Sequence, residues 1–307
     1  IGSEEHREAL DNCALIISSQ ADNYVVNYFG EHSDWKKKFV FLQHGVTLHD
    51  LSAWLNFKNI SLFVTTTNEE WESIVSPQSH YRFDDKVVKL LGMPRHDKLL
   101  TMNQPEKIIL IAPTWRKYLS TKEIDKREFL ESEYSRCWSA LINSPELYDL
   151  IQKYGYRIVF VPHPNMRQFL DYMECPDYVR VFNYKQESLQ EVIARACILI
   201  TDYSSLAFEM ALLCKSVIYY QFDVNCFYAP GMHTYRKGYF SYVDNGFGEV
   251  VTDAKQLIEI LNNYLLNSCQ PPQKYQLRMR NCFPFRDGKN SERVFSEIEK
   301  LVTLQRL

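Results

Sequence analysis

The sequence predicts an α/β protein made of two units, each with a parallel β-sheet covered by helices. Three observations lead to this prediction. Short β-branched or aromatic runs alternate along the chain with amphipathic stretches, which is typical of sheets whose strands are connected by helices. The 307 residues are too many for one small core and about right for two α/β units. Hydrophobic residues make up 46% of the chain and charged residues 24%, as in a folded globular protein.

Nine runs are predicted to be strands, and most of them end at a turn or a capping residue that leads into a helix. The first four are Ala14–Ser18, Phe39–Leu42, Leu62–Thr65 and Val87–Leu91. The other five are Ile108–Ala112, Arg157–Val161, Val179–Phe182, Ile198–Thr201 and Ser216–Tyr220. Two late helices are predicted as well: Ala254–Leu265 with Asp253 as its N-cap, and Glu292–Leu304 with Ser291 as its N-cap.

The boundary between the units is predicted in the polar stretch Thr101–Lys107, where Pro105 separates two strand–helix series. This gives an N-terminal domain over residues 1–103 and a C-terminal one over residues 104–283. The final helix, within residues 284–307, is expected to cross back to the first domain. The chain begins without methionine, so we expect a piece of a longer protein with further domains.

The composition disfavours several classes of protein function. The net charge of -3 and the lack of a basic stripe make nucleic acid an unexpected partner. The eight cysteines show no Cys-x-x-Cys pair and no zinc-like spacing, which indicates reduced thiols in a cytosolic compartment and no metal site. The longest apolar runs have the length of strands, so none is expected to span a bilayer.

Polar residues directly after strands are the candidates for function, because ligands of open α/β sheets bind beyond the carboxyl ends of the strands. His44 and Gly45 follow one strand; the imidazole can take a proton near neutral pH, and the glycine permits close approach of a substrate. His163 stands between two prolines that restrict its backbone. The alternatives are a structural loop histidine at residue 44 and a rigid turn with an incidental histidine at residue 163.

A third cluster follows the strand Ile198–Thr201. Ser204 and Ser205 precede a helix, where hydroxyls and unpaired backbone N–H groups bind phosphate, although one serine could simply cap the helix. Glu209, one turn further, could bind ribose hydroxyls or be an ordinary surface carboxylate. Arg116, after the strand Ile108–Ala112, could clamp a diphosphate or be a solvated surface residue.

Other nucleotide and hydrolase motifs are missing from the sequence. The Tyr203-Ser204-Ser205 turn lacks the glycines of a hydrolase nucleophile elbow. There is no P-loop and no glycine-rich dinucleotide turn, and the whole chain has ten glycines. Kinases, dehydrogenases and serine hydrolases are therefore disfavoured. The two histidines, two serines and the arginine would converge if the two sheets face one another across a cleft, and such a site is consistent with a transferase that binds a diphosphate.

Nine stretches in order resemble the CDP-glycerol glycerophosphotransferase family, which makes teichoic acids and related capsule polymers. They are Gln43–Gly45, Leu91–Asp97, Ala112–Arg116, Pro162–Pro164, Ile200–Ser205 with Phe208 and Glu209, Tyr219–Asp223, Gly238–Phe240, Gly246–Gly248, and Asp287–Lys289 with Ser291–Arg293. The resemblance implies a GT-B fold of two Rossmann-like domains, with parallel sheets facing a central cleft. The active site would lie between the acceptor-side first domain and the CDP-donor-binding second domain.

The resemblance also implies roles for individual residues. His44 would be the general base, while His163, Ser204 and Ser205 would hold the donor's diphosphate. Arg116 and Arg293 would assist with the diphosphate. Glu209 stands where similar proteins often carry Asp, and it would bind the ribose. Gly45 and His49 belong to the acceptor-side loop, which departs from the Thr-Pro-Leu-Lys common in teichoic acid polymerases and leaves the acceptor's identity open.

The activity implied is transfer of a polyol phosphate from CDP-glycerol or CDP-ribitol to a hydroxyl of a growing cell-surface polymer, with release of CMP. No cofactor is required by the sequence, and Mg²⁺ is compatible with it. The acceptor would be a polymer or a lipid-linked oligosaccharide, so the protein is expected in the cytoplasm, with peripheral contact at the inner face of the plasma membrane. The alternatives are another GT-B enzyme that uses a UDP- or CMP-sugar, such as a glycosyltransferase or an epimerase, and a catalytically silent domain that binds nucleotide or polymer.

Overall fold

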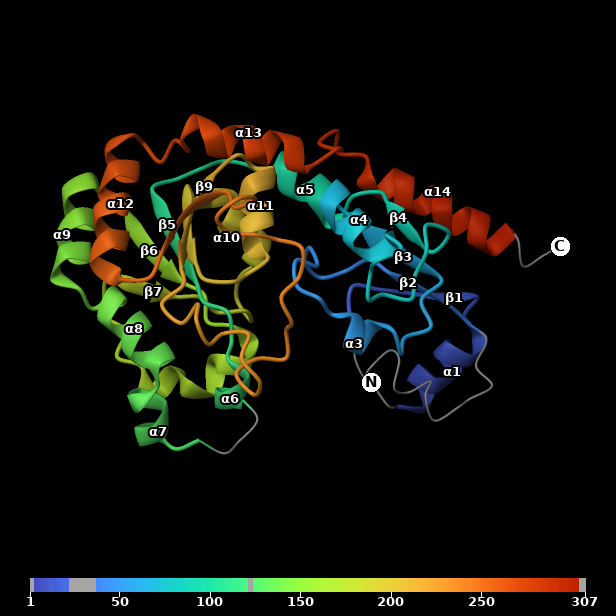
Figure 1. The fold of residues 1–307 in the computed structure, drawn as a ribbon, viewed down its shortest axis with the longest axis horizontal. Helices are drawn as coiled ribbons and strands as arrows, with labels where there is room; N and C mark the ends of the chain where they lie inside the picture. Colours follow the sequence, from blue (N-terminus) through green and yellow to red (C-terminus); the bar gives the residue numbers. More distant parts are fainter. Residues whose placement is uncertain (1–2, 22–36, 121–123, 304–307) are drawn as a thin grey trace. The chain divides into compact units, whose positions relative to one another are not determined.

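The computed structural model describes residues 3–21, 37–120 and 124–303 and divides into two compact units. Unit 1 comprises the described residues up to Thr101 and from Cys282 onward, and unit 2 runs from Met102 to Asn281. Each unit holds one parallel sheet, as the sequence predicts (Figure 1).

The sheet of unit 1 has four parallel strands in the order β1-β2-β3-β4. They are β1 (Leu15–Ser18), β2 (Lys38–Phe41), β3 (Leu62–Thr65) and β4 (Val88–Leu90). The helices of this unit are α1 (Glu4–Asn12), α3 (Ser52–Leu55), α4 (Asn68–Val75), α5 (Arg95–Thr101) and α14 (Asn290–Thr303).

Alternation along the strands gives the sheet of unit 1 two apolar faces, because successive strand side chains point to opposite sides. Phe39 and Phe41 of β2 pack in one cluster with Ile74 of α4. Val40, which lies between the two phenylalanines, packs in another cluster with Val294 of α14. Helix α14 therefore covers the face of this sheet opposite α4.

The start of α14 corrects one prediction. The helix begins at Asn290, so Ser291 lies in its first turn and is not its N-cap. The carboxylate of Asp97, from α5, accepts the backbone N–H groups of Asn290 at 2.9 Å and Ser291 at 2.8 Å and does the capping instead. Gly92 has a φ of 78°, and a Cβ there would lie 2.2 Å from the Asn290 side chain. The predicted end at Leu304 lies outside the described residues.

Unit 2 contains a six-stranded parallel sheet in the order β10-β9-β8-β5-β6-β7. Its strands are β5 (Ile108–Ala112), β6 (Arg157–Phe160), β7 (Val179–Val181), β8 (Ile198–Thr201), β9 (Ser216–Tyr220) and β10 (Gly248–Val251). Its helices are α6 (Lys117–Ser120), α7 (Lys126–Glu131), α8 (Glu133–Ile142), α9 (Pro145–Tyr154), η1 (Pro164–Tyr172), α10 (Leu189–Arg195), α11 (Leu206–Leu212) and α12 (Ala254–Leu266), with α13 (Gln273–Cys282) ending at the boundary between the units.

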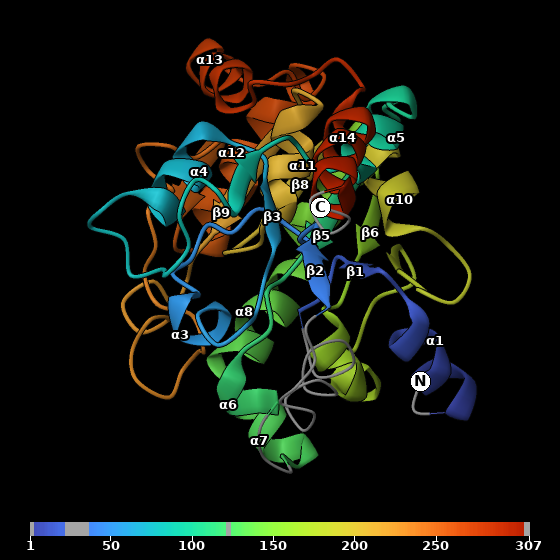
Figure 2. The ribbon, with the colours of Figure 1, turned by 90° about the vertical axis from the view of Figure 1, so that its right-hand side faces the viewer.

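Helices cover both faces of the sheet of unit 2. One core cluster joins alternate residues of β5, β6, β8 and β9 to α8, α9 and α12, while α10 and α11 lie on the other face (Figures 1 and 2). All residues of β5, β8 and β9 are buried, which explains why their sequences are continuously apolar rather than alternating.

The nine predicted strands are all present, and the structure adds a tenth. Strand β10 pairs with β9, with Gly248 opposite Val217. Its sequence, Gly-Glu-Val-Val, begins with a glycine and a charged residue, both uncommon in strands, and so does not stand out. A Cβ at Gly248 would lie 1.6 Å from the Val217 carbonyl oxygen, so the pairing depends on glycine. The predicted cap of α12 is confirmed, because Asp253 accepts the Gln256 N–H at 2.9 Å.

Candidate functional site

The order of strands in unit 2 creates a topological switch point between β5 and β8. From β5 the chain moves outward through β6 and β7, then returns to β8 on the other side of β5 and continues to β9 and β10. Ala112, at the end of β5, pairs with Thr201, at the end of β8. In doubly wound sheets, ligands bind outside the carboxyl ends of strands at such a point.

Three of the four predicted clusters lie at this edge, because β5, β6 and β8 are adjacent and parallel. Thr114–Arg116 follow β5, Pro162–Pro164 follow β6, and Asp202–Ser205 follow β8. The structure thus brings together Arg116, His163 and the two serines at one end of one sheet. The fourth cluster, at His44, belongs to unit 1.

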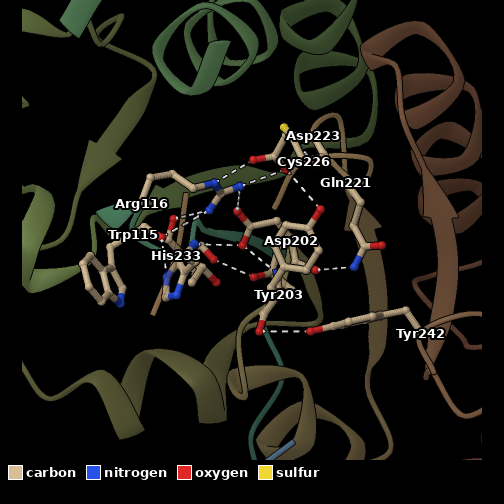
Figure 3. Close-up of polar contacts among 12 residues, drawn as sticks. Trp115, Arg116, Asp202, Tyr203, Gln221, Asp223, Cys226, His233 and Tyr242 are labelled. Carbon is tan, nitrogen blue, oxygen red and sulfur yellow. Dashed lines mark hydrogen bonds and ion pairs between the residues drawn. The ribbon is translucent and has the colours of Figure 1, made fainter. Parts of the chain in front are cut away.

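Arg116 has a different role from the predicted one. Its side chain is 0% exposed, and its guanidinium donates to Asp223 through Nε at 2.7 Å and to Asp202 through Nη2 at 2.9 Å (Figure 3). Nη1 donates to the Thr114 carbonyl at 2.8 Å. The donors of this guanidinium are shielded from solvent and bond the segments that follow β5, β8 and β9. They therefore do not face a diphosphate.

Aromatic rings complete the surroundings of this guanidinium. Its central carbon lies 4.9 Å from the ring centroid of Phe227 and 5.3 Å from that of Tyr203. Burial alone would lower the pKa of Arg116, but the carboxylates of Asp202 and Asp223 outweigh it, so the net shift of this pKa is upward. Arg116 is therefore a permanent buried cation.

The same cluster positions the loop that carries the serines. Asp202 accepts the backbone N–H of Thr114 at 2.8 Å and of Tyr203 at 2.7 Å, and Gln221 donates to the Asp202 carbonyl at 3.0 Å (Figure 3). Tyr203 stacks on Phe227 with centroids 3.6 Å apart. The turn before Ser204 is therefore held from β5 and from the segment after β9.

Ser204 and Ser205 are half-buried at the start of α11. The hydroxyl oxygen of Ser204 accepts the Leu206 N–H at 3.2 Å. This contact agrees with the alternative in which one serine simply caps the helix. Ser205 is the N-cap by position, but its side chain makes no capping hydrogen bond. The Ser205 hydroxyl therefore takes no part in capping the start of α11.

His163 is half-buried and begins the 3₁₀ helix η1. Its Nδ1 accepts the backbone N–H of Asn165 at 3.2 Å, which places the proton of the neutral ring on Nε2. Trp115 lies alongside, with ring centroids 6.1 Å apart and planes 26° apart. The prolines and this contact give the imidazole a defined direction, as the sequence predicts.

Sequence reasoning missed His233, which braces Trp115. Its Nδ1 accepts the backbone N–H groups of Thr234 at 2.9 Å and Tyr235 at 3.1 Å, so its Nε2–H donates to the Trp115 carbonyl at 3.1 Å. The ring centroids of His233 and Trp115 are 4.6 Å apart. His233 follows no strand directly, so the rule that found the other candidates could not find it.

Glu209, the predicted ribose ligand, lies in the first turn of α11 and is 3% exposed. It is therefore not the ordinary surface carboxylate of the alternative interpretation. Its ribose-binding role stays a prediction.

The loop after β2 in unit 1 carries His44. The side chain of His44 is exposed, and its carbonyl accepts Nη1 of Arg95 at 2.5 Å. The preceding residue, Gln43, is 3% exposed and has a φ of 63°, in the left-handed region that residues other than glycine seldom adopt. An exposed histidine thus follows a buried residue in an uncommon backbone conformation.

A buried carboxylate that sequence reasoning missed lies under this loop. Glu70 is 0% exposed and accepts Nε2 of Gln43 at 3.0 Å, the Thr47 N–H at 2.6 Å and the Thr66 N–H at 2.7 Å. Burial raises the pKa of Glu70 to about 7, against the opposing effect of these hydrogen bonds. The spacing Thr67-x-x-Glu70 before a helix is a capping-box signal that could have drawn attention to it.

Of the other three predicted residues of unit 1, two are buried and Arg293 is half-buried. His49, expected on an acceptor-facing loop with Gly45, is 6% exposed, and Gly45 is buried as well. Arg293, expected near the diphosphate, forms a bidentate pair with Asp287 at 2.8 and 2.9 Å and donates to the Leu91 carbonyl at 2.9 Å. This pairing lowers the pKa of Asp287 to about 2. Arg293 therefore anchors α14 next to β4.

Two negative findings apply to the described residues. No group of three or more His, Cys, Asp or Glu in residues 3–21, 37–120 and 124–303 is placed to hold a metal ion. Within the same ranges, no helix combines the length and apolarity needed to cross a membrane. The meeting of His44 with His163, Ser204 and Ser205 across a cleft stays a prediction, because these residues belong to different units.

Comparison with known proteins gives a family match over nearly the whole chain. The family model for CDP-glycerol:poly(glycerophosphate) glycerophosphotransferase matches residues 2–300. The minor teichoic acid biosynthesis protein GgaB of Bacillus subtilis is 34% identical over 97% of this chain, which spans 34% of the length of GgaB. The teichoic acid glycerol-phosphate primase of the same organism is 26% identical over 78% of this chain and 58% of its own length.

Solved structures match the fold. The wall teichoic acid polymerase TagF, in a structure soaked with CDPG, matches with a TM-score of 0.69 and 20% identity, covering 99% of this chain and 77% of that one. A UDP-GlcNAc 2-epimerase of Methanocaldococcus jannaschii matches with a TM-score of 0.55 and 14% identity, covering 97% of this chain and 79% of that one. The predicted GT-B fold is confirmed by these matches and by the two parallel sheets.

Proposed function

The chain belongs to the CDP-glycerol:poly(glycerophosphate) glycerophosphotransferase family, and we propose that it transfers glycerol phosphate or ribitol phosphate from the CDP-activated polyol to a hydroxyl of a teichoic acid or capsule polymer. The products are the extended polymer and CMP. The chain spans 34% of the length of GgaB, so the activity of the whole relative enters here as a proposal.

The observation that carries this proposal is the placement of His163, Ser204 and Ser205 at the β5–β8 switch point of unit 2. A nucleoside diphosphate needs hydrogen-bond donors directed at its phosphates and a turn held rigidly enough to keep them there. The Nε2–H of His163 and the Ser205 hydroxyl are such donors, and the buried cluster around Arg116 supplies the rigidity.

The reaction is an in-line phosphoryl transfer. An acceptor hydroxyl oxygen forms a new bond to the β-phosphorus of the CDP-polyol, and the bond from that phosphorus to the bridging oxygen breaks. The bridging oxygen leaves with the electron pair as part of CMP, while His44 takes the acceptor's proton. His163, Ser204 and Ser205 stabilise the charge that develops on the departing α-phosphate. The step as written uses no cofactor, and Mg²⁺ on the diphosphate would add to the charge neutralisation.

The acceptor side of the proposal rests on the exposed His44. The acceptor is a polymer or a lipid-linked oligosaccharide, so the enzyme works in the cytoplasm at the inner face of the plasma membrane. The departure of Val46–Asp50 from the common Thr-Pro-Leu-Lys and the inward position of His49 leave the acceptor's repeat to be found by experiment.

The test is nucleotide release. The chain is incubated with an acceptor and CDP-glycerol, CDP-ribitol or UDP-sugars, and CMP and UDP are quantified by chromatography. CMP release that requires both the CDP-polyol and the acceptor supports the proposal. UDP release from a UDP-sugar, or no turnover with any donor, contradicts it.

His44→Ala is expected to lower kcat by about 10²–10⁴-fold, because a general base contributes that much, while binding of the CDP-polyol is retained. The measurement is CMP release together with calorimetric binding of CDP-glycerol. His80→Ala, which removes another exposed histidine of unit 1, serves as the matched control and keeps activity. Unchanged turnover in His44→Ala would remove this residue from the mechanism.

A further inference from the structure

The loop that carries His44 is held in an unusual backbone conformation. Gln43, directly before His44, has a φ of 63° although it is not a glycine. Backbone conformations of this kind persist only when the surrounding structure imposes them. The contacts that impose this one therefore bear on where the His44 imidazole points.

One buried carboxylate binds the loop on both sides of His44. Glu70 accepts the Gln43 amide at 3.0 Å and the Thr47 N–H at 2.6 Å, while its second oxygen accepts the Thr66 N–H at 2.7 Å. The Gln43 amide also donates to the Val64 carbonyl of β3 at 2.6 Å. The turn from residue 43 to residue 47 is thus attached to α4 at both ends and to β3 at residue 43.

A simple helix cap does not explain this arrangement. The capping-box spacing from Thr67 to Glu70 accounts for hydrogen bonds at the start of α4. It gives no reason for the same carboxylate to reach residues 27 and 23 positions earlier in the chain. Those two contacts add nothing to a helix end, but they determine the path of the His44 loop.

We propose that Glu70 is a positioning residue that orients His44 for removal of the acceptor's proton. The inference rests on the proposed function for the proton transfer itself, and on the contacts of Glu70 for the geometry. Donor N–H groups approach both oxygens of Glu70, so both oxygens must accept. The isosteric amide of Glu70→Gln cannot satisfy them, because it would turn one N–H toward another.

The experiment compares Glu70→Gln with Glu69→Gln, which removes the same charge from the neighbouring, exposed residue of the same helix. For each variant we measure kcat for CMP release, calorimetric binding of CDP-glycerol and the thermal unfolding midpoint. Independently of activity, the imidazole resonances of His44 are followed by NMR, with their assignment given by their loss in His44→Gln.

Glu70→Gln is expected to lower kcat by about 100-fold, since misplacing a reacting group by about 1 Å can cost this much. Binding of CDP-glycerol stays unchanged, the assay temperature stays below the unfolding midpoint, and the His44 resonances shift or broaden. Glu69→Gln matches the wild type in every measurement. A split of this kind separates positioning from a loss of stability, which would also lower donor binding.

Unchanged His44 resonances and unchanged kcat in Glu70→Gln overturn the inference. If Glu70→Gln does not fold, Gln43→Gly provides the second test, because glycine tolerates the positive φ but cannot bond Glu70; unaltered His44 resonances in that variant also overturn it. Absence of CMP release from the wild type contradicts the proposed function instead, and the NMR comparison still decides whether Glu70 orients His44.

Discussion

At the scale of single residues, the side chains that offer chemistry are supported by buried polar partners. His163 takes its orientation from the Asn165 N–H and from Trp115, and Trp115 in turn is braced by His233. His44 is exposed, but the loop that carries it is attached to Glu70, which is 0% exposed. His44 thus depends on a carboxylate that no solvent reaches, and His163 depends on the half-buried Trp115, which the buried His233 braces.

The buried Glu70 leads to a prediction about stability and pH. Its pKa is raised from 4.5 to about 7 by burial, so the folded protein keeps a proton that the unfolded chain has lost between these values. The stability from this group is fully present below about pH 4.5 and is lost as pH rises through about 7. The difference between these two pKa values corresponds to about 3 kcal/mol of unfolding free energy at most.

Urea unfolding of the wild type, Glu70→Gln and Glu69→Gln at pH 5 and pH 8 checks this. The wild type and Glu69→Gln are expected to lose more unfolding free energy between the two pH values than Glu70→Gln does, because the amide does not titrate. Equal losses in all three proteins would show that Glu70 does not titrate in this range.

At the scale of elements, the Arg116 cluster joins the ends of three strands of unit 2. Arg116 follows β5, Asp202 follows β8 and Asp223 lies shortly after β9. Each of these groups would be costly to bury alone, and each is satisfied by the others. The turn from Asp202 to Ser205 inherits its position from this cluster.

Arg116→Met is expected to lower the free energy of unfolding by about 3–5 kcal/mol, because it leaves two carboxylates buried without their cation. The matched control is Arg127→Met, which breaks an ion pair whose side chains are 84% and 65% exposed. Exposed pairs contribute about 1 kcal/mol or less. Equilibrium unfolding in urea measures both, and a cost for Arg116→Met no larger than for Arg127→Met would contradict the role assigned to the cluster.

At the scale of the whole molecule, the two sheets divide the proposed work. Unit 2 holds the switch point with His163, Ser204 and Ser205, where the donor would bind, and unit 1 holds His44 and its supporting network. The family relationship covers both units, since the match runs from residue 2 to residue 300. Donor binding and proton removal should therefore be separable by experiment.

CDP-glycerol at about 100 times its Kd is expected to stabilise the protein by about 2.7 kcal/mol, because it binds the folded state alone. Hydrogen exchange should slow in three segments of unit 2: residues 113–116, 162–165 and 202–206. The double variant Ser204→Ala with Ser205→Ala should lose much of this protection. Protection confined to other segments would place the donor elsewhere.

Local sequence patterns determined most of the fold and the outline of the site. Continuous apolar runs mark the strands of unit 2 because both faces of its sheet are covered, and polar residues after those runs mark the sheet edge where ligands bind. His163, Ser204 and Ser205 are predicted in this way, and His44 is predicted from its place after a strand of unit 1. Asp253 was recognised as a cap because capping is a contact within four residues.

Only the tertiary structure decided which polar side chains face inward. Arg116 is a buried anchor because Asp223, 107 positions away, lies beside it once β8 and β9 are paired. Glu70 reaches Gln43 because β2 and β3 are neighbours, and His233 meets Trp115 across 118 positions. Hydrogen bonds and desolvation depend on distance in space, and a spacing along the chain records that distance only for residues within the same element or turn.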